Sequence, residues 1–445
     1  MKKVITYGTY DLFHYGHQRL LERAKALGDY LIVGVTADSF DLTRGKINVQ
    51  QSLMERVEAV RATGIADEII IEEYEGQKID DIKRYNVDIF TVGSDWKGKF
   101  DYLNEFCKVV YLDRTEGVSS SEIRAEQHEL KLGLVGDAAF LNKFYRESKY
   151  VNGMDVVGIC TDNTSSLSKE LTDAIPVVDK LDDLISNCDA LYFITSPVIR
   201  YESVKRALNC GKHVLCESPI CVSLAEWNDL KSIAKKNDCV LMDAIRTAYS
   251  TAFSRLLVLV KSGRIGEVVS VDATCTSLRN VELEGNGDLD KGWNSICTWG
   301  PAALLPIFYL LGTTYCQKTI SSRMESTHYD SFTKVAFTFP HAVASIKVGQ
   351  GVKSEGELII SGTKGYVYVP APWWKTDYFE IRYENTADNK RYFYQLDGEG
   401  IRNELVVFLK SIVLGRNTQC IDDEISQAIV KVMEDFYNSK DLIRI

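Results

Sequence analysis

Two places in the 445-residue chain carry the pattern with which an α/β domain begins. Lys3–Gly8 is a short β-forming run that ends in glycine, and Lys131–Gly136 repeats this pattern much later in the chain. Each run leads into apolar residues at the spacing of an amphipathic helix. Since this is how an α/β domain begins, the repetition predicts two α/β units joined end to end.

Strands and helices alternate along the first unit, which predicts a parallel sheet covered by helices on both faces. The second unit alternates in the same way to about Ile245, and long strands dominate after that point. We therefore expect three domains, residues 1–128, 129–246 and 247–445, all of the α/β class. The expected strands are Lys3–Tyr7, Tyr30–Thr36, Glu68–Glu72, Ile89–Val92, Val109–Leu112, Val156–Cys160, Val268–Thr274, Lys334–Phe339 and Ala344–Val348. The expected helices are Gly16–Leu27, Leu53–Ala62, Lys78–Tyr85, Ser119–Leu130 and Ser426–Tyr437.

Composition argues against several classes of protein. The chain has 52 basic and 62 acidic side chains, and this net charge of -10 argues against a nucleic-acid binder. The eleven cysteines are odd in number and scattered, with no CxxC pair, so we expect reduced thiols in a cytoplasmic protein. The longest apolar run, Ala302–Leu311, is shorter than the about 20 residues that a membrane helix needs, and no membrane insertion is expected.

His14-Tyr15-Gly16-His17 brings two of the six histidines together between a strand and a helix. The start of a helix attracts anions, because its first backbone N–H groups and the positive end of its dipole point outward. Gly16 would let the backbone approach a phosphate, and the two imidazoles could stabilise charge on a phosphoryl group. The alternative is a helix start that carries two histidines without a ligand.

Three motifs in order, Val4–Asp11, His14–His17 and Arg114–Ser121, resemble those of the nucleotidylyltransferase superfamily, and within it those of the glycerol-3-phosphate cytidylyltransferases. The similarity runs from Met1 to about Arg124 and includes Gly93–Asp101. It implies an acceptor phosphate that attacks the α-phosphorus of CTP in line, with Mg²⁺ accompanying the nucleotide and pyrophosphate leaving. No other metal site is expected.

The resemblance also implies the roles of individual residues. The residues that would act on the transferring phosphate are His14, His17, Arg114 and Lys46. Those that would bind the nucleotide are Gly8, Thr9, Tyr10, Asp11, Gly16, Asp95, Trp96, Ser119, Ser120 and Ser121. Arg56 is a further phosphate ligand or, like Lys46, part of a solvated face. Because residues 40–53 and 61–66 depart from the family pattern, the acceptor is glycerol 3-phosphate or another polyol phosphate.

The second unit begins where a dinucleotide-binding turn would lie, but only the first of that turn's three glycines is present. Gly136 is that glycine, and Ala138 replaces the second. After the next strand, Thr161 stands in place of the expected ribose-binding acid, with Asp162 beside it. A Rossmann-like fold without a cofactor is therefore as good an interpretation as NAD(P) binding, to which Gly136, Thr161, Asp162 and Glu217 would contribute.

Lys212–Pro219, Leu259–Glu267 and Ile360–Gly365 resemble the Gfo/Idh/MocA oxidoreductase family, which implies a Rossmann domain followed by an α/β domain with an open antiparallel sheet. That sheet often makes oligomer contacts in the family, so we expect a homo-oligomer, such as a dimer. The family's catalytic lysine is replaced by Ser218. Its aspartate and its histidine or tyrosine are replaced by Thr298 and Ala302.

The leading interpretation is therefore a cytidylyltransferase that makes CDP-glycerol or a related compound for teichoic-acid or capsule-type polymers, with a dehydrogenase-like half that has lost its usual catalysis. One alternative is a bifunctional enzyme, in which an NAD(P)-dependent reductase produces the polyol phosphate that the first half activates. A second alternative is a pair of binding or scaffold modules, which conflicts with the intact His14–His17 and Arg114–Gly117 motifs.

Overall fold

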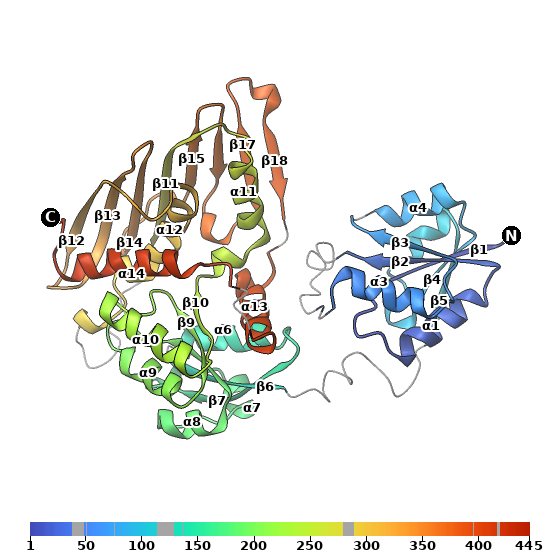
Figure 1. Cartoon of the computed structure of the whole chain (residues 1–445), viewed down its shortest axis with the longest axis horizontal. Coiled ribbons are helices and arrows are strands. Elements are labelled where there is room, and N and C mark those ends of the chain that lie inside the picture. The colour runs from blue at the N-terminus through green and yellow to red at the C-terminus, as the bar shows by residue number, and fades with distance from the viewer. Residues whose placement is uncertain are drawn as a thin grey trace. The chain divides into compact units, whose positions relative to one another are not determined.

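A computed structural model describes residues 1–37, 49, 51–74, 76–113, 129–136, 138–278, 289–394, 396–415 and 419–445, and the side chains of Asp95, Ala138 and Asp397 are outside this description. The contacts divide the chain into two compact units, Met1–Glu129 and Leu130–Ile445 (Figure 1). Each unit has its own sheets and its own core, and we describe each by itself.

The first unit contains a five-stranded parallel sheet of order β3-β2-β1-β4-β5. Its strands are β1 (Lys3–Gly8), β2 (Tyr30–Thr36), β3 (Glu68–Glu72), β4 (Ile89–Gly93) and β5 (Lys108–Leu112). Its helices are α1 (Tyr15–Lys25), α3 (Leu53–Ala62) and α4 (Gln77–Tyr85), with the 3-10 turns η1 (Ser94–Trp96) and η2 (Asp101–Glu105). The strands and helices expected for residues 1–112 are confirmed to within two residues.

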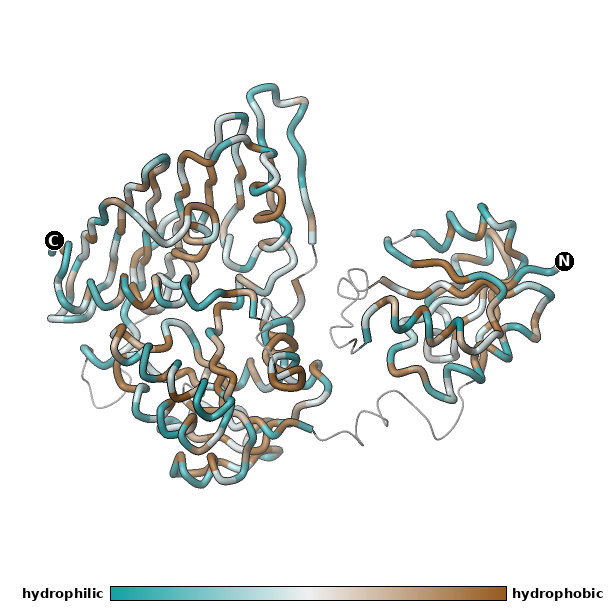
Figure 2. Tube along the Cα trace, in the orientation of Figure 1, coloured by the Kyte–Doolittle hydropathy of each residue, from teal (hydrophilic) through white to brown (hydrophobic). Residues whose placement is uncertain are grey.

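Neighbouring residues of each strand point to opposite faces of this sheet, and both faces are buried. Val4 belongs to the core cluster that also contains residues of α1 and α3, whereas Ile5 belongs to the cluster that contains Ile82 of α4. Figure 2 shows the apolar strands between more polar helices. The parallel sheet with covered faces is as predicted.

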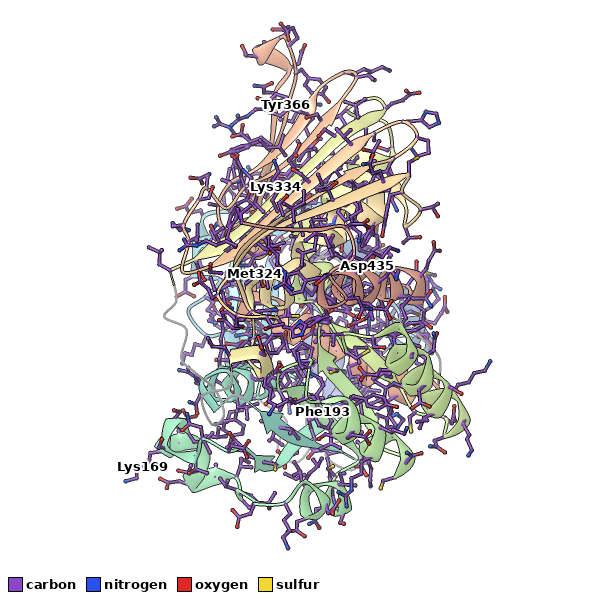
Figure 3. All side chains as sticks on the ribbon, turned by 90° about the vertical axis from the view of Figure 1, so that its left-hand side faces the viewer. Lys169, Phe193, Met324, Lys334, Tyr366 and Asp435 are labelled. Atoms are coloured by element: carbon purple, nitrogen blue, oxygen red, sulfur yellow. The ribbon has the colours of Figure 1, made fainter. Side chains whose placement is uncertain are left out.

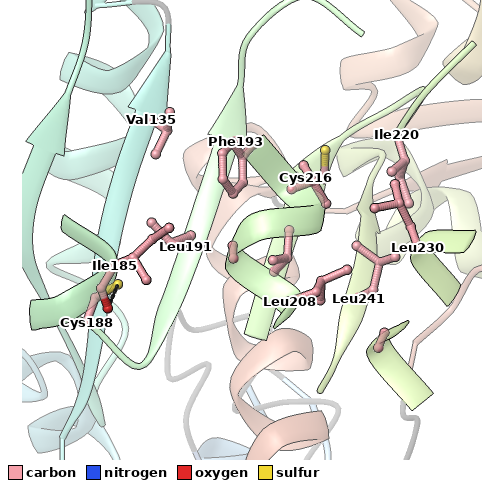
Figure 4. Close-up of a cluster of buried hydrophobic side chains, with 14 of the residues drawn as sticks. Val135, Ile185, Cys188, Leu191, Phe193, Leu208, Cys216, Ile220, Leu230 and Leu241 are labelled. Atoms are coloured by element: carbon pink, nitrogen blue, oxygen red, sulfur yellow. Dashed lines mark hydrogen bonds between the residues drawn. The ribbon is translucent and has the colours of Figure 1, made fainter. Parts of the chain in front are cut away.

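The second unit begins with another five-stranded parallel sheet, of order β10-β9-β8-β6-β7. Its strands are β6 (Leu130–Gly136), β7 (Met154–Cys160), β8 (Ala190–Ile194), β9 (His213–Glu217) and β10 (Leu241–Ala244). Its helices are α6 (Ala138–Ser148), α7 (Lys169–Ala174), α8 (Leu181–Asn187), α9 (Tyr201–Asn209) and α10 (Leu224–Lys236), with the 3-10 turn η3 (Thr164–Ser166). Figure 4 shows the core between this sheet and its helices, which includes Phe193, Leu208 and Leu230.

A nine-stranded mixed sheet follows, in the order β18-β17-β16-β15-β11-β14-β13-β12-β19. Most of its neighbours are antiparallel, as expected, but the pairs β11–β14 and β12–β19 are parallel. The strands are β11 (Val268–Ser277), β12 (Gln317–Met324), β13 (Asp330–Thr338), β14 (Val343–Gln350), β15 (Leu358–Gly362), β16 (Tyr366–Val369), β17 (Tyr378–Arg382), β18 (Lys390–Phe393) and β19 (Leu442–Arg444).

One face of the nine-stranded sheet is covered and the other is open. Along β13, buried Val335 and Phe337 alternate with exposed Lys334 and Ala336. The sheet is seen with its side chains in Figure 3. The remaining helices and 3-10 turns of this half are η4 (Arg246–Tyr249), α11 (Thr251–Lys261), η5 (Leu289–Lys291), α12 (Ser295–Leu311), η6 (Trp373–Lys375), η7 (Thr386–Asp388), η8 (Asp397–Gly400), α13 (Ile401–Val413) and α14 (Asp423–Tyr437).

Helix α12 packs on β11, β13 and β14, and this contact explains its apolar composition. Residues 289–311 are the one segment of the described chain that is long and apolar enough to cross a membrane, and most of it is buried inside the second unit. All eleven cysteines are unbridged; five are buried and three are exposed.

Aspartates hold the amino ends of the parallel strands in both units. Asp29 accepts the backbone N–H of Lys2 at 2.6 Å, and Asp88 accepts that of Lys3 at 2.7 Å. In the second unit the N–H of Lys131 donates to Asp189 at 2.9 Å. These carboxylates satisfy donors that would otherwise be left at the edge of each sheet.

Candidate functional site

The turn between β1 and α1 carries most of the described residues that the sequence assigned to the first unit. Tyr10 and Leu12 adopt left-handed backbone angles, with φ of 54° and 47°, which non-glycine residues adopt only when their surroundings hold them. A β-carbon at Gly8 would lie 3.0 Å from the Tyr10 ring, so a side chain at this position would push against that ring. Buried Thr9 and Asp11 lie between these positions.

His14 and His17 lie together at the start of α1. His14 is the N-cap residue, and its Nδ1 accepts the N–H of Gly16 at 3.0 Å. The N–H of Gly16 is therefore occupied, rather than free for an anion as the sequence suggested. The His17 ring stacks on that of His14, with 3.9 Å between centroids, and its edge meets Tyr10 at 5.5 Å. Since Nδ1 of His14 is an acceptor, its ring proton lies on Nε2, which can donate to a ligand.

Gln51, which the sequence did not single out, joins this turn to the start of α3. The N–H of Gln51 donates to Asp11 at 3.0 Å, and its side-chain Oε1 accepts the N–H of Leu12 at 2.8 Å. These two bonds hold Leu12 in its left-handed conformation. The helix start is further fixed by a capping box between Ser52 and Glu55.

Arg56 lies beneath the turn and is fully buried. Its guanidinium donates to the carbonyl oxygens of Thr9 at 2.7 Å and Thr36 at 2.8 Å, and its Nε donates to that of Gln51 at 3.1 Å. The solvated-face alternative is therefore wrong for Arg56. Its described bonds are to the backbone, so it supports the shape of the turn.

A line of buried polar groups continues from Arg56 along the carboxyl edge of the sheet. The Thr36 hydroxyl donates to Glu72 at 3.0 Å, and Glu72 pairs with buried Lys78 of α4. The Tyr7 hydroxyl donates to Asp81 at 2.8 Å, and burial raises the pKa of Tyr7. The sequence signal for this network is weak, because its members come from β1, β2, β3 and α4.

Trp96 lies in η1, just after β4, at the same edge of the sheet. Its ring packs on Phe100, with 5.8 Å between centroids, and Lys99 Nζ lies 5.2 Å from its centroid. The side chain of Asp95 and all of Lys46, Arg114, Ser119, Ser120 and Ser121 lie outside the described residues. The structure thus brings together Gly8 to Asp11, His14, Gly16 and His17. The roles expected for the lysine, the arginine and the three serines stay predictions.

In the second unit, the turn after β6 differs from the three-glycine turn that binds a dinucleotide. Gly136 has a φ of 124°, and a β-carbon there would lie 2.6 Å from the carbonyl carbon of Ile194, so packing against β8 already requires this glycine. Leu141 occupies the place of the third glycine and is fully buried. The hydroxyl of Thr161 accepts the N–H of Asn163 at 3.3 Å, while Asp162 is exposed.

These residues do not fit the three-glycine turn that brings a dinucleotide pyrophosphate close to the backbone. In the sequence, Ala138 stands at the second glycine position, and the third is taken by Leu141, which is fully buried. Glu217 accepts the Tyr192 hydroxyl at 2.6 Å, and both belong to the carboxyl half of the sheet.

The sequence assigned Ser218, Thr298 and Ala302 to the positions of the catalytic side chains of the Gfo/Idh/MocA family. Ser218 is buried just after β9, before a cis peptide bond to Pro219. Thr298 of α12 accepts the Gln350 amide at 2.6 Å, and Ala302 lies one turn further along that helix. His213, half-buried at the start of β9, accepts the N–H of Val240 at 3.0 Å and so has a structural role, as expected.

Family comparisons agree with this division of the chain. Residues 5–126 match the Cytidylyltransferase-like family model, and residues 130–244 match the model described as Oxidoreductase family, NAD-binding Rossmann fold. The first unit is 51% identical over 130 residues to a glycerol-3-phosphate cytidylyltransferase of Bacillus spizizenii, covering 29% of this chain and all of that protein. The chain is a cytidylyltransferase-like domain fused to a Gfo/Idh/MocA oxidoreductase domain.

The cytidylyltransferase domain is similarly close to the Staphylococcus aureus glycerol-3-phosphate cytidylyltransferase, with 47% identity over 28% of this chain and 95% of that protein. For the oxidoreductase domain, a 3-ketoreductase from Actinomadura kijaniata in complex with NADP aligns with a TM-score of 0.61 and 16% identity, covering 71% of this chain and 99% of that chain. At this identity the likeness shows the fold alone. The expected families and fold class are thus confirmed.

Proposed function

We propose that the cytidylyltransferase domain transfers CMP from CTP to a polyol phosphate, with glycerol 3-phosphate as the preferred acceptor. The observation that carries this proposal is the stacked pair of His14 and His17 at the start of α1, in a domain about 50% identical to glycerol-3-phosphate cytidylyltransferases. The products would be CDP-glycerol, or its polyol analogue, and pyrophosphate.

The acceptor phosphate oxygen would attack the α-phosphorus of CTP, and the bond to the β-phosphate oxygen would break. The Nε2 proton of His14 and the imidazole of His17 would face the charge that develops on the transferring group. Mg²⁺ would enter with the triphosphate and neutralise part of its charge. Arg56, Gln51 and Asp11 would not touch the reacting atoms; they would hold the turn in place.

We propose that the oxidoreductase domain does not perform the hydride transfer typical of its family. Ser218, Thr298 and Ala302 stand where the proton-transferring side chains would be, and serine, threonine and alanine are poor general acids near neutral pH. The misfit at Ala138 and Leu141 supports the same proposal. The protein would work in the cytoplasm as a homo-oligomer and supply a teichoic-acid or capsule-type pathway.

The proposal is tested by measuring pyrophosphate release from CTP and Mg²⁺ with glycerol 3-phosphate, glycerol 2-phosphate and ribitol 5-phosphate as acceptors. His14→Asn keeps an N-cap oxygen for the Gly16 N–H but removes the imidazole, so the helix start should survive. We expect kcat to fall by about 100-fold or more, as when a transition-state donor is removed.

Tyr15→Phe is the matched control, because Tyr15 is the exposed neighbour of His14 and should leave turnover unchanged. If the wild-type chain releases no pyrophosphate with any of the three acceptors, the proposed function is wrong. If His14→Asn and Tyr15→Phe turn over equally well, the histidine pair does not perform the chemistry.

A further inference from the structure

Two of the crossings between the two sheets of the second unit lie side by side. The first crossing is η4, which leads from β10 of the parallel sheet to α11. The second is η8, which leads from β18 of the nine-stranded sheet to α13, and α13 packs beside α6 (Figure 1). Asn403 of α13 donates to the Tyr249 carbonyl of η4 at 2.9 Å. Adjacent crossings are the arrangement of a hinge, because a few residues at element ends can absorb a rotation there.

The backbone of η8 is left-handed at three successive residues. Gly398, Glu399 and Gly400 have φ of 61°, 51° and 86°. Glycine adopts such angles freely, but glutamate does so only at a cost in free energy and therefore needs contacts that hold it there. A β-carbon at Gly400 would lie 2.8 Å from the Arg246 carbonyl oxygen, so η8 is strained at the place where it meets η4.

The side chain of Glu399 makes contacts that hold η8 in this conformation. Its Oε2 pairs with Lys143 of α6 and with Lys375 of η6, the latter at 2.7 Å. Helix α6 covers the parallel sheet, whereas η6 lies between β16 and β17 of the nine-stranded sheet, so one carboxylate joins the two halves of the unit. Burial would raise the pKa of Glu399, but the hydrogen bonds and charges of the two lysines outweigh burial and lower it to about 2. The carboxylate is therefore ionised at neutral pH.

A neighbouring ion pair attaches α13 to α6 more firmly. Arg402 pairs with Glu147 of α6 at 2.7 Å and covers the Tyr150 ring, with 3.8 Å from Cζ to the centroid. The side chains of Arg402 and Glu147 are 15% and 18% exposed, against 33% for Glu399. The Arg402 pair is thus the better shielded from salt, and the pairs of Glu399 are the ones that salt can screen.

We propose that η8 is a strained clasp at a hinge of the second unit, closed by the ion pairs of Glu399 with Lys143 and Lys375. Release of these pairs would let the parallel-sheet half and the nine-stranded half open about η4 and η8. The left-handed backbone favours release and the ion pairs oppose it, so the equilibrium between the two forms should respond to ionic strength. The clasp lies in the oxidoreductase domain and does not depend on the function proposed for the cytidylyltransferase domain.

The test is hydrogen–deuterium exchange of the full-length chain in dilute buffer and in about 1 M NaCl. A peptide that covers residues 397–406 reports on the clasp, and one that covers β9 reports on global unfolding. A peptide that covers residues 289–295 reports on opening, because Ser196, after β8, donates to the Gly292 carbonyl at 3.4 Å between the two halves. In the wild type, salt should speed exchange about threefold in the clasp and opening peptides and leave β9 unchanged.

Variants separate the ion pairs from the backbone strain. Glu399→Gln keeps the strain but loses the charge, so exchange in dilute buffer should be about fivefold faster and no longer depend on salt. Glu399→Gly loses both, and its clasp peptide should exchange about threefold more slowly than that of Glu399→Gln. The matched control is Asp229→Asn, which removes the same charge from a pair with Lys205 of similar exposure and should behave as the wild type does. If Glu399→Gln also speeds exchange of β9, Lys375→Met, which removes one pair only, carries the test.

The proposal is overturned if Glu399→Gln exchanges as the wild type does, or if Asp229→Asn speeds exchange by the same factor. It is also overturned if only residues 397–406 exchange faster while residues 289–295 do not change, because the clasp would then fray without opening the two halves. If Glu399→Gly exchanges as fast as Glu399→Gln, the backbone of η8 is not strained and the clasp is wrong. Pyrophosphate release, which Glu399→Gln should leave unchanged, reports separately on the first domain.

Discussion

His14 uses its two ring nitrogens for different purposes. Nδ1 caps α1 by accepting the Gly16 N–H, which leaves the ring proton on Nε2. This bond fixes the tautomer before any ligand arrives, which lowers the reorganisation needed when charge develops on a phosphoryl group. The sequence predicted the position of His14 but not this division of roles, because the cap bond depends on the side-chain angle.

Arg56 gives a first prediction. Arg56→Met should destabilise the first unit by about 3 kcal/mol, because three buried carbonyl oxygens lose a charged donor. Chemical denaturation, followed by a probe in this unit, measures the loss. Arg61→Met, in the exposed last turn of the same helix, is the control and should change stability little. Equal denaturation midpoints for Arg56→Met and Arg61→Met would contradict the structural role assigned to Arg56.

At the scale of elements, Asp330 fixes the start of α12. It is fully buried, and its carboxylate accepts the Ile296 N–H at 3.2 Å and the Thr333 hydroxyl at 2.6 Å. Burial raises its pKa to about 6, although these hydrogen bonds act in the opposite direction.

A folded-state pKa above the unfolded value means that the protonated form stabilises the fold. The stabilisation by Asp330 is complete below pH 4 and is lost as the pH rises through about 6. Asp330→Asn should remove this dependence, which is worth about 2–3 kcal/mol. Urea denaturation of both proteins at pH 4, 5, 6 and 7 measures it. If the free energy of unfolding changes with pH in the same way for the wild type and the variant, Asp330 does not titrate in this range.

The buried pair of Lys318 on β12 and Asp435 on α14 joins a strand to a helix. Both side chains are nearly inaccessible, and Nζ lies 2.6 Å from the carboxylate. Asp435→Leu alone should cost about 3–5 kcal/mol because it leaves a buried charge, whereas the double variant with Lys318→Met should recover most of this loss. A double-mutant cycle by denaturation measures the coupling; additive effects would mean that Asp441, whose carboxylate lies 3.5 Å from Lys318 Nζ, already compensates the lysine.

At the scale of the whole molecule, each unit has its own core, so the chain should unfold in two transitions. CTP with Mg²⁺ should stabilise only the first unit. At a hundredfold excess over Kd, its free energy of unfolding should rise by about 2.7 kcal/mol. Calorimetry with and without CTP measures this shift, and Tyr15→Phe should behave as the wild type does. A single cooperative transition that moves as a whole would contradict the independence of the units.

Most of the fold could be predicted from the sequence because strand–helix alternation is a local property. The order of the nine-stranded sheet could not, since β11 lies between β14 and β15, which are far from it in sequence. The same difference between local and long-range contacts decides which parts of the candidate site could be predicted. His14 and Gly16 are recognisable from their neighbours, but the bonds of Arg56 join the turn after β1, the end of β2 and the start of α3.

The aspartates at the amino edge of the first sheet have an electrostatic consequence. The chain carries a net charge of -10 and yet is proposed to bind a triphosphate. Asp29 and Asp88 lie at the opposite end of the strands from His14, and six residues of β1 span about 20 Å. This distance exceeds two screening lengths at physiological ionic strength. In dilute buffer the same carboxylates would repel the approaching nucleotide, so association should become faster as salt is first added.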